Sequence, residues 1–288
     1  MKIFDEKLSM NPKQPYRLIS YASYDAAMNM AIDEAILEAH LAGHVPPTLR
    51  IYQFSPPAVS FGYAQKVDDN LIAKIKKQNL AVVRRPTGGR AVLHMGDITY
   101  AFICSSKGAP VSEYALVGES IAAAYKQICQ ALILALNSLG VQTALGHKNG
   151  RYQDKHDCFA AVTAADLQHQ GKKIVGSAQL RRRHAVLQHG SIILYQPQSL
   201  LPALLNHDRE NGDNIQHHNS DNTQLQHDGN SHHASLYDIL GCRPGFADLG
   251  KALKHGFELA FENQFLAAPL TSLEEELTVS LLTKHKRF

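Results

Sequence analysis

The order of apolar and polar residues along the chain predicts a mixture of helices and strands. Apolar residues recur at helical spacing over residues 24–40, and Ser23 is placed to cap the start of this helix. A second long helix is predicted over residues 119–139, and Gly140 marks its end. From Leu236 onward the pattern is again helical, and Ser272 and Glu275 have the spacing of a capping box.

Between these helices, short runs rich in β-branched and aromatic residues predict strands in two blocks. The first block covers residues 49–54, 58–61, 80–85, 91–94 and 98–104, and the second covers residues 159–168, 173–181 and 185–195. His169-Gln170-Gly171-Lys172 is typical of a hairpin turn. Because strands and helices do not alternate regularly, we expect an α+β fold with mixed β-sheets flanked by helices.

Residues 207–233 differ from the rest of the chain. They are crowded with His, Asn, Asp, Gln and Ser and contain almost nothing apolar. Such a stretch cannot bury enough apolar surface to offset the entropy lost on ordering, so we predict a flexible surface insert. Its histidines show no ligand spacing, and we expect no functional metal site there.

Composition and charge narrow the class of protein. Hydrophobic residues make up 44% of the 288-residue chain and charged residues 19%, which is enough to bury a sizeable core. A net charge of +3 is too small to imply a nucleic-acid partner. The sequence has neither an apolar run of about 18 residues nor a signal peptide. We therefore expect a cytoplasmic protein without a membrane partner, folded as one domain over residues 1–288.

The four cysteines, Cys104, Cys129, Cys158 and Cys242, are widely spaced. None belongs to a C-x-x-C pair, so neither a zinc ribbon nor a disulfide framework is indicated. We expect reduced thiols, and the common fate of such a thiol is that of a small buried hydrophobic residue.

The stretch Arg84-Arg85-Pro86-Thr87-Gly88-Gly89-Arg90 joins two predicted strands. Paired glycines let a ligand approach the backbone closely, and arginines pair bidentately with phosphate or carboxylate. An ordinary tight hairpin with solvated arginines has the same composition, so both interpretations stay open. The stretch is neither a Walker A loop nor a dinucleotide fingerprint.

Cys158 and Lys173 lie on neighbouring predicted strands of the second block. If these strands pair as a hairpin, the Lys173 ammonium approaches the thiol. A free thiol has a pKa of about 8.5 and is little ionised at neutral pH, whereas a nearby ammonium favours the thiolate. A cysteine and a lysine are therefore an adequate pair for acyl transfer.

Several motifs, in one order along nearly the whole chain, resemble those of the biotin/lipoate protein ligase superfamily. They are Asn29-Met30-Ala31-Ile32-Asp33-Glu34, Ser60-Phe61-Gly62-Tyr63, residues 84–94, Cys158-Phe159-Ala160-Ala161, residues 173–179 and Gln188-His189-Gly190-Ser191. Within the superfamily, the chain is most similar to the ligase-like octanoyl-[acyl carrier protein]:protein N-octanoyltransferases. This resemblance implies an acyltransferase domain with a catalytic core over about residues 44–255.

By this resemblance, Cys158 carries the acyl group as a thioester. Lys173, rather than Lys172, lowers the thiol pKa and contacts the acyl carbonyl. His94 is either a participant in catalysis or a hydrogen-bonded neighbour of the site. The family pattern has several acids after this histidine, whereas here Asp97 alone remains. The implied substrate-binding residues are Arg85, Thr87, Gly88, Gly89, Arg90, His94, Gly176, Ser177, Ala178, His189 and Gly190.

The implied reaction transfers octanoate from acyl carrier protein to Cys158, and then to a lysine of a lipoyl domain such as the glycine-cleavage H protein. No cofactor is expected, because a thioester is already activated. Three alternatives remain: an amidotransferase between lipoylated proteins, an ATP-dependent lipoate ligase, and an inactive module that binds lipoyl domains or carrier proteins. The presence of Cys158 argues against the ligase, and Cys158 with Lys173 argues against the inactive module.

Overall fold

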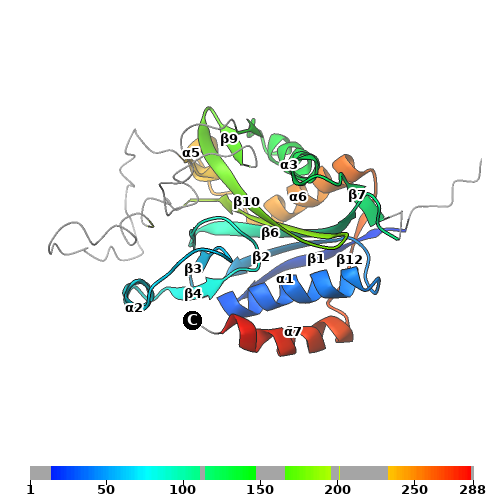
Figure 1. The fold of residues 1–288 in the computed structure, drawn as a ribbon. Coiled ribbons are helices and arrows are strands. Elements are labelled where there is room, and N and C mark those ends of the chain that lie inside the picture. The colour runs from blue at the N-terminus through cyan, green and yellow to red at the C-terminus, as the bar shows by residue number, and fades with distance from the viewer. Residues whose placement is uncertain (1–13, 111–113, 147–165, 196–200, 202–232, 287–288) are drawn as a thin grey trace, which may run out of the picture.

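The computed structural model describes residues 14–110, 114–146, 166–195, 201 and 233–286 (Figure 1). These residues form two β-sheets flanked by helices, as the sequence predicts. The larger sheet has nine strands in the described part of the chain. Its order is β12 (Phe265–Ala267), β1 (Tyr16–Tyr24), β2 (Thr48–Phe54), β6 (Asp97–Ser106), β11 (Ala185–Ile193), β10 (Lys172–Arg182), β9 (Leu167–His169) and β8 (Ala144–Leu145), with β7 (Ala115–Val117) beside β6.

Helices cover both faces of the large sheet (Figure 1). One face is covered by α3 (Ile121–Ser138), α5 (Leu236–Leu240) and α6 (Phe246–Phe261). The helices α3 and α6 pack closely at Gly256, where a Cβ atom would collide with the main chain at Ala131. The other face is covered by α1 (Ala26–Leu41), and α7 (Ser272–His285) packs on the outside of α1.

Because α1 lies between the sheet and α7, nearly all of it is buried, including the polar side chains of Asn29, Asp33 and Glu34. A helix with buried residues all round fits this position between two layers. Its N-cap is Asp25, whose side chain accepts from the Met28 amide, so the prediction of Ser23 as the cap was wrong.

Other ends and elements also differ from the sequence prediction. The capping box of α7 is formed by Thr271 and Glu274, one residue before the predicted pair. The strands β1 and β12 and the helix α2 (Asp69–Lys77) were not predicted. The hairpin turn between β9 and β10 is confirmed, since Gln170 and Gly171 both have positive φ angles, of 48° and 80°.

The smaller sheet has the order β4 (Ala81–Arg84), β3 (Ala58–Phe61) and β5 (Val92–His94). The strand β3 lies between the other two, parallel to β4 and antiparallel to β5. Residues 85–91 therefore cross over β3 rather than forming a tight hairpin, so that alternative was wrong.

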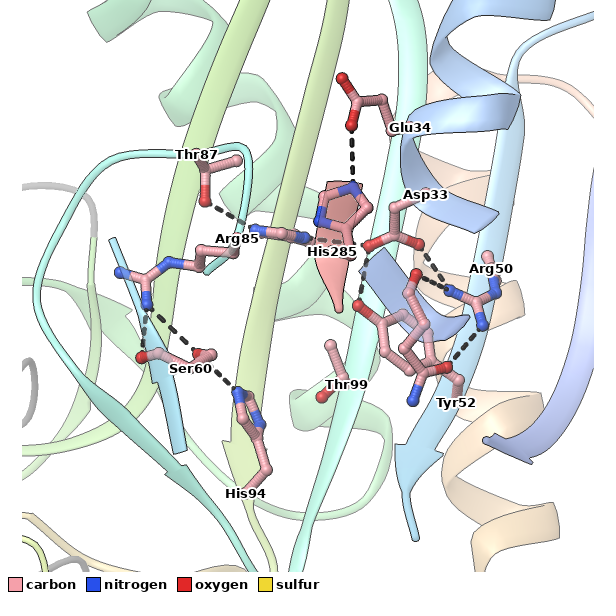
Figure 2. Close-up of polar contacts among 12 residues, drawn as sticks. Asp33, Glu34, Arg50, Tyr52, Ser60, Arg85, Thr87, His94, Thr99 and His285 are labelled. Atoms are coloured by element: carbon pink, nitrogen blue, oxygen red, sulfur yellow. Dashed lines mark hydrogen bonds and ion pairs between the residues drawn. The ribbon is translucent and has the colours of Figure 1, made fainter. Parts of the chain in front are cut away.

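A cluster around Glu34 fastens α7 to α1. The Glu34 carboxylate accepts from His285 Nε2 at 2.9 Å and from Lys284 Nζ at 2.7 Å, and it also pairs with Arg182 of β10. The contact with His285 is drawn in Figure 2. Burial raises the pKa of Glu34, but the hydrogen bonds from these three partners outweigh burial and bring the pKa to about 2.

None of the helices in the described segments is both long enough and apolar enough to cross a membrane. Cys158, most of the predicted strand 159–168 and residues 207–232 of the predicted insert lie outside the described residues. The insert's last residue, His233, is described and forms a single parallel bridge with Lys173.

Candidate functional site

A pocket lies where the small sheet, α1 and the large sheet meet. Counted with its open mouth, the empty volume of the pocket is about 570 Å³. Met30, Phe54 and Val92 supply apolar lining, and Lys173 and Asp166 supply charged groups. Such a pocket suits a ligand with a hydrocarbon tail and a polar head.

Strand register brings distant motifs into the same wall. On β10 and β11, Gly176 faces Ser191, Ser177 faces Gly190, and Ala178 faces His189. A Cβ atom on Gly190 would lie 2.6 Å from Ser177 Oγ, so only glycine leaves this wall open.

The structure brings most of the predicted site residues together. The lining residues among them are Arg85, Gly89, His94, Lys173, Gly176, Ser177, Ala178, His189 and Gly190. Thr87, Gly88 and Arg90 belong to the adjoining turn and do not line the pocket. Cys158 lies outside the described residues.

Hydrogen bonds from the Arg85 side chain stabilise the turn over residues 86–90. The Arg85 guanidinium is buried and donates to the carbonyl oxygens of Gly88, at 2.8 Å, and Arg90, at 2.6 Å. Gly89 has a φ of +91° and approaches Gly62 so closely that a Cβ atom on Gly62 would collide with it. Arg85 is thus a structural part of the turn rather than a solvated arginine.

The Lys173 side chain is fully buried, and its Nζ lies 2.9 Å from Asp166 Oδ1. Burying a charged side chain is costly in free energy unless the charge is paired, and Asp166 supplies that pairing for Lys173. Asp166 was not among the site residues predicted from the sequence. The signal was present, because the β9–β10 hairpin brings an acid just before β9 back toward the first residues of β10.

Asp33 of α1 is the centre of a second buried network (Figure 2). Its carboxylate accepts from Arg50 Nη1 at 2.6 Å, from the Tyr52 hydroxyl at 2.8 Å and from His189 Nδ1 at 3.0 Å. The other ring nitrogen of His189, Nε2, lies 2.7 Å from Thr87 Oγ1. Asp33 therefore reaches the glycine turn through one histidine.

Charge fixes the hydrogen-bond directions in this network. Burial raises the pKa of Asp33, but Arg50 and His189 outweigh burial and lower it, so Asp33 is a carboxylate. Burial lowers the pKa of His189, so its ring is neutral at neutral pH. The single ring proton then lies on Nδ1 and is donated to Asp33, and the Thr87 hydroxyl donates to Nε2.

His94 has a comparable set of partners. Its Nδ1 lies 2.8 Å from Asp97 Oδ2, and its Nε2 lies 2.9 Å from Ser60 Oγ. Ser191 Oγ donates to the same Asp97 oxygen at 2.6 Å. The ring stacks on Phe54 with centroids 3.8 Å apart. The contact between Asp97 and His94 and the place of the Ser60 hydroxyl beside the ring were not predicted from the sequence.

Within the described ranges, no group of three or more His, Cys, Asp or Glu side chains is arranged to hold a metal ion. The charged groups of the pocket are instead paired with each other or with main-chain atoms.

Comparison with known proteins decides the family. The sequence pattern of the lipoyl protein ligase A/B catalytic domain matches residues 25–258. The chain belongs to this family. The matched range includes α1 with Asp33, the small sheet, the strands of the large sheet other than β1 and β12, and nearly all of α6.

Curated relatives of this lipoyl ligase family chain carry a narrower name. The protein named Octanoyltransferase LipM of Kyrpidia tusciae is 34% identical over 280 residues, which are 94% of this chain and 96% of that protein. A protein of the same name from Clostridioides difficile is 32% identical over 276 residues, with 94% and 96% covered.

Solved structures agree on the fold. A lipoate-protein ligase A bound with ATP superposes with a TM-score of 0.69 at 23% identity, covering 94% of this chain and 95% of that chain. The bipartite lipoate protein ligase of Thermoplasma acidophilum gives a TM-score of 0.67 at 23% identity, covering 94% and 92%. These likenesses confirm the ligase-like architecture expected from the motifs.

Proposed function

We propose that this enzyme takes an octanoyl group from octanoyl-acyl carrier protein as a thioester on Cys158. It then passes the group to a lysine of a lipoyl domain, such as that of the glycine-cleavage H protein. Without the donor, the acceptor and the thioester being specified, the chain is an octanoyltransferase of protein lipoylation. This assignment is carried by one observation, the 34% and 32% identity to curated octanoyltransferases along nearly the whole of both chains.

The pocket supports an acyl substrate. Met30, Phe54 and Val92 offer apolar lining, and each buried CH₂ group of an acyl chain contributes about 0.8 kcal/mol. Lys173 supplies a buried ammonium for the carbonyl end of the acyl group. Asp166 offsets part of its charge, so the stabilisation of a nearby thiolate is smaller than that from an isolated ammonium.

The properties of the three described cysteines argue against each of them as the nucleophile, and so support Cys158 in that role. Cys104 and Cys129 are buried in the core, and burial raises the pKa of Cys104 and brings that of Cys129 to about 12, so neither thiol ionises at neutral pH. Cys242 is exposed and does not line the pocket. A nucleophilic thiol for the pocket is therefore expected from Cys158.

The chemistry needs no ATP. The Cys158 thiolate attacks the donor thioester and releases the carrier thiol, and the acceptor amine then attacks the acyl-enzyme and releases the Cys158 thiolate. Because donor and acceptor are both proteins, the acyl group waits on the enzyme while they exchange, which predicts ping-pong kinetics.

The test is intact mass spectrometry of the protein mixed with octanoyl-acyl carrier protein in the absence of ATP. An octanoyl adduct is expected for the wild type and for Cys242→Ala, and none for Cys158→Ala. Parallel tubes supply either octanoic acid with ATP or an octanoylated lipoyl domain as donor. Product in the ATP tube alone would establish a ligase, and product from the lipoyl-domain donor alone would establish an amidotransferase.

A further inference from the structure

Transfer to a lysine amine raises a proton requirement that Cys158 and Lys173 do not meet. When a neutral amine attacks a thioester, its nitrogen becomes positively charged in the tetrahedral intermediate. That nitrogen must lose a proton before the C–S bond breaks, or the amine leaves again instead of the sulfur. A base within reach of the pocket is therefore needed for the second half of the proposed reaction.

Most titratable groups that line the pocket already form ion pairs or hydrogen bonds that prevent them from acting as the base. Lys173 and Asp166 form a buried ion pair, and a proton moved onto Asp166 would leave the Lys173 ammonium without its counter-ion. His189 donates from Nδ1 to Asp33, and its Nε2 accepts from Thr87, which belongs to the turn and does not line the pocket.

His94 is placed differently, because its Nε2 accepts from a hydroxyl that itself lines the pocket. Ser60 Oγ lies 2.9 Å from that nitrogen and lines the pocket together with the ring. Arg85 Nη1 donates to the same hydroxyl at 3.2 Å, which leaves one oxygen lone pair for the proton of an incoming amine. Figure 2 shows the Ser60 side chain between Arg85 and His94.

Asp97 prepares the ring for this task. Its carboxylate, fixed by Ser191, lies 2.8 Å from His94 Nδ1, so Nδ1 carries the ring proton and Nε2 is the free base. The same carboxylate stabilises the imidazolium that forms when Nε2 takes a proton, as the aspartate of a Ser-His-Asp triad does.

We propose that Ser60 and His94 accept the proton of the attacking lysine in the second half-reaction, with Asp97 as a positioning residue; this inference rests on the proposed function. The amine nitrogen forms the C–N bond and gives its proton to Ser60 Oγ, while the Ser60 hydroxyl proton passes to His94 Nε2. The C–S bond then breaks, its electron pair stays on Cys158, and the imidazolium releases its proton to solvent. Serine is a proton conduit here and forms no acyl bond.

The experiment uses the nucleophile to separate the relay from the thioester. Octanoyl-enzyme is prepared on the full-length protein, and single-turnover loss of the adduct is followed by mass with apo lipoyl domain or with hydroxylamine. Hydroxylamine gives an intermediate that is acidic enough to lose its proton to water, so it needs no relay. General base catalysis contributes about 100-fold to 10,000-fold. We expect His94→Gln and Ser60→Ala to slow lysine acylation by about 100-fold or more, with little change for hydroxylamine.

Asp97→Asn tests the positioning role. It is expected to lower the single-turnover rate constant for lysine, while the acceptor concentration that gives half the maximal rate stays the same. Free imidazole should partly restore the rate of His94→Ala, because the ring leaves a cavity of its own shape. A purely structural role for His94 predicts neither the dependence on the nucleophile nor the rescue.

A matched control is His40→Gln. His40 is also buried, and its Nε2 lies 2.9 Å from Ser105 Oγ, but neither residue lines the pocket. This variant should leave the ratio of the lysine and hydroxylamine rates as in the wild type.

The outcomes separate the two proposals. A wild type that forms no octanoyl adduct overturns the Cys158 thioester, and the relay with it. A wild type that forms the adduct while His94→Gln acylates lysine at the wild-type rate overturns the relay alone. Equal slowing with both nucleophiles also overturns it.

Discussion

Replacing Asp33 with asparagine would perturb the buried network that links α1 to the glycine turn. The carboxylate is fully buried and accepts from Arg50, Tyr52 and His189. The asparagine amide brings a hydrogen-bond donor among these donors and removes the negative charge that balances Arg50. Removing one partner of a buried ion pair costs about 3–5 kcal/mol.

The lower end of that range is expected here, for a structural reason. The Arg50 guanidinium keeps two bonds to Asn29, to the side-chain oxygen at 2.7 Å and to the main-chain oxygen at 3.1 Å. We therefore expect Asp33→Asn to lower the free energy of unfolding by about 3 kcal/mol. His189 should also change tautomer, because its Nδ1 then faces an amide donor and accepts instead of donating.

Urea unfolding of the wild type and the variant measures the first effect, provided that the m-value does not change. NMR of ¹⁵N-labelled histidine measures the second, with His189→Gln to assign the signal. Asp248→Asn is the control, because the Asp248 pair with Lys251 is exposed and such pairs contribute at most about 1 kcal/mol. A loss below about 1 kcal/mol, or an unchanged His189 tautomer, would refute the reasoning.

Three further predictions concern Lys173, Glu34 and residues 207–233. Lys173→Ala should raise the pH at which Cys158 reacts with iodoacetamide. The corresponding change in free energy should be smaller than the roughly 4 kcal/mol of an unopposed ammonium, because a carboxylate already pairs with Lys173. Lys172→Ala should not raise this pH, and equal pH profiles for Lys173→Ala and the wild type would contradict the assignment. Glu34→Gln should cost about 3 kcal/mol at pH 7. The pKa of Glu34 is depressed from 4.5 to about 2 by folding, so this contribution is complete above pH 4.5 and lost as the pH falls to about 2, where the urea midpoints of the two proteins should converge. Deleting residues 207–233 with a short Gly/Ser link should leave octanoyl transfer intact; loss of transfer with retained fold would mean that the segment contacts a partner.

Local pattern was enough for the two long helices α1 and α3 and for most strands, but not for the nine-residue strand β1. The helices α1 and α3, the β9–β10 turn and most strands of both sheets follow from periodicity and turn residues, because these signals act over a few neighbouring residues. The ends of the helices in the structure differ from the predicted ends by one or two residues, because several Ser, Thr and Asp residues compete for each cap. The short edge strand β12 was not predicted, because a three-residue strand is stabilised by its distant partner β1 and not by its own sequence.

The sequence by itself determined the composition of the site: the glycine turn, the lysine beside Gly176-Ser177-Ala178, and the motif order that resembles lipoyl ligases and octanoyltransferases. Only the tertiary structure decided how these groups are held. Asp33 and His189 are 156 residues apart, and Ser60 and His94 belong to strands of a separate small sheet. A buried charge or ring nitrogen takes its partner from whichever element packs against it, and that choice is made by strand register and helix packing rather than by sequence neighbours.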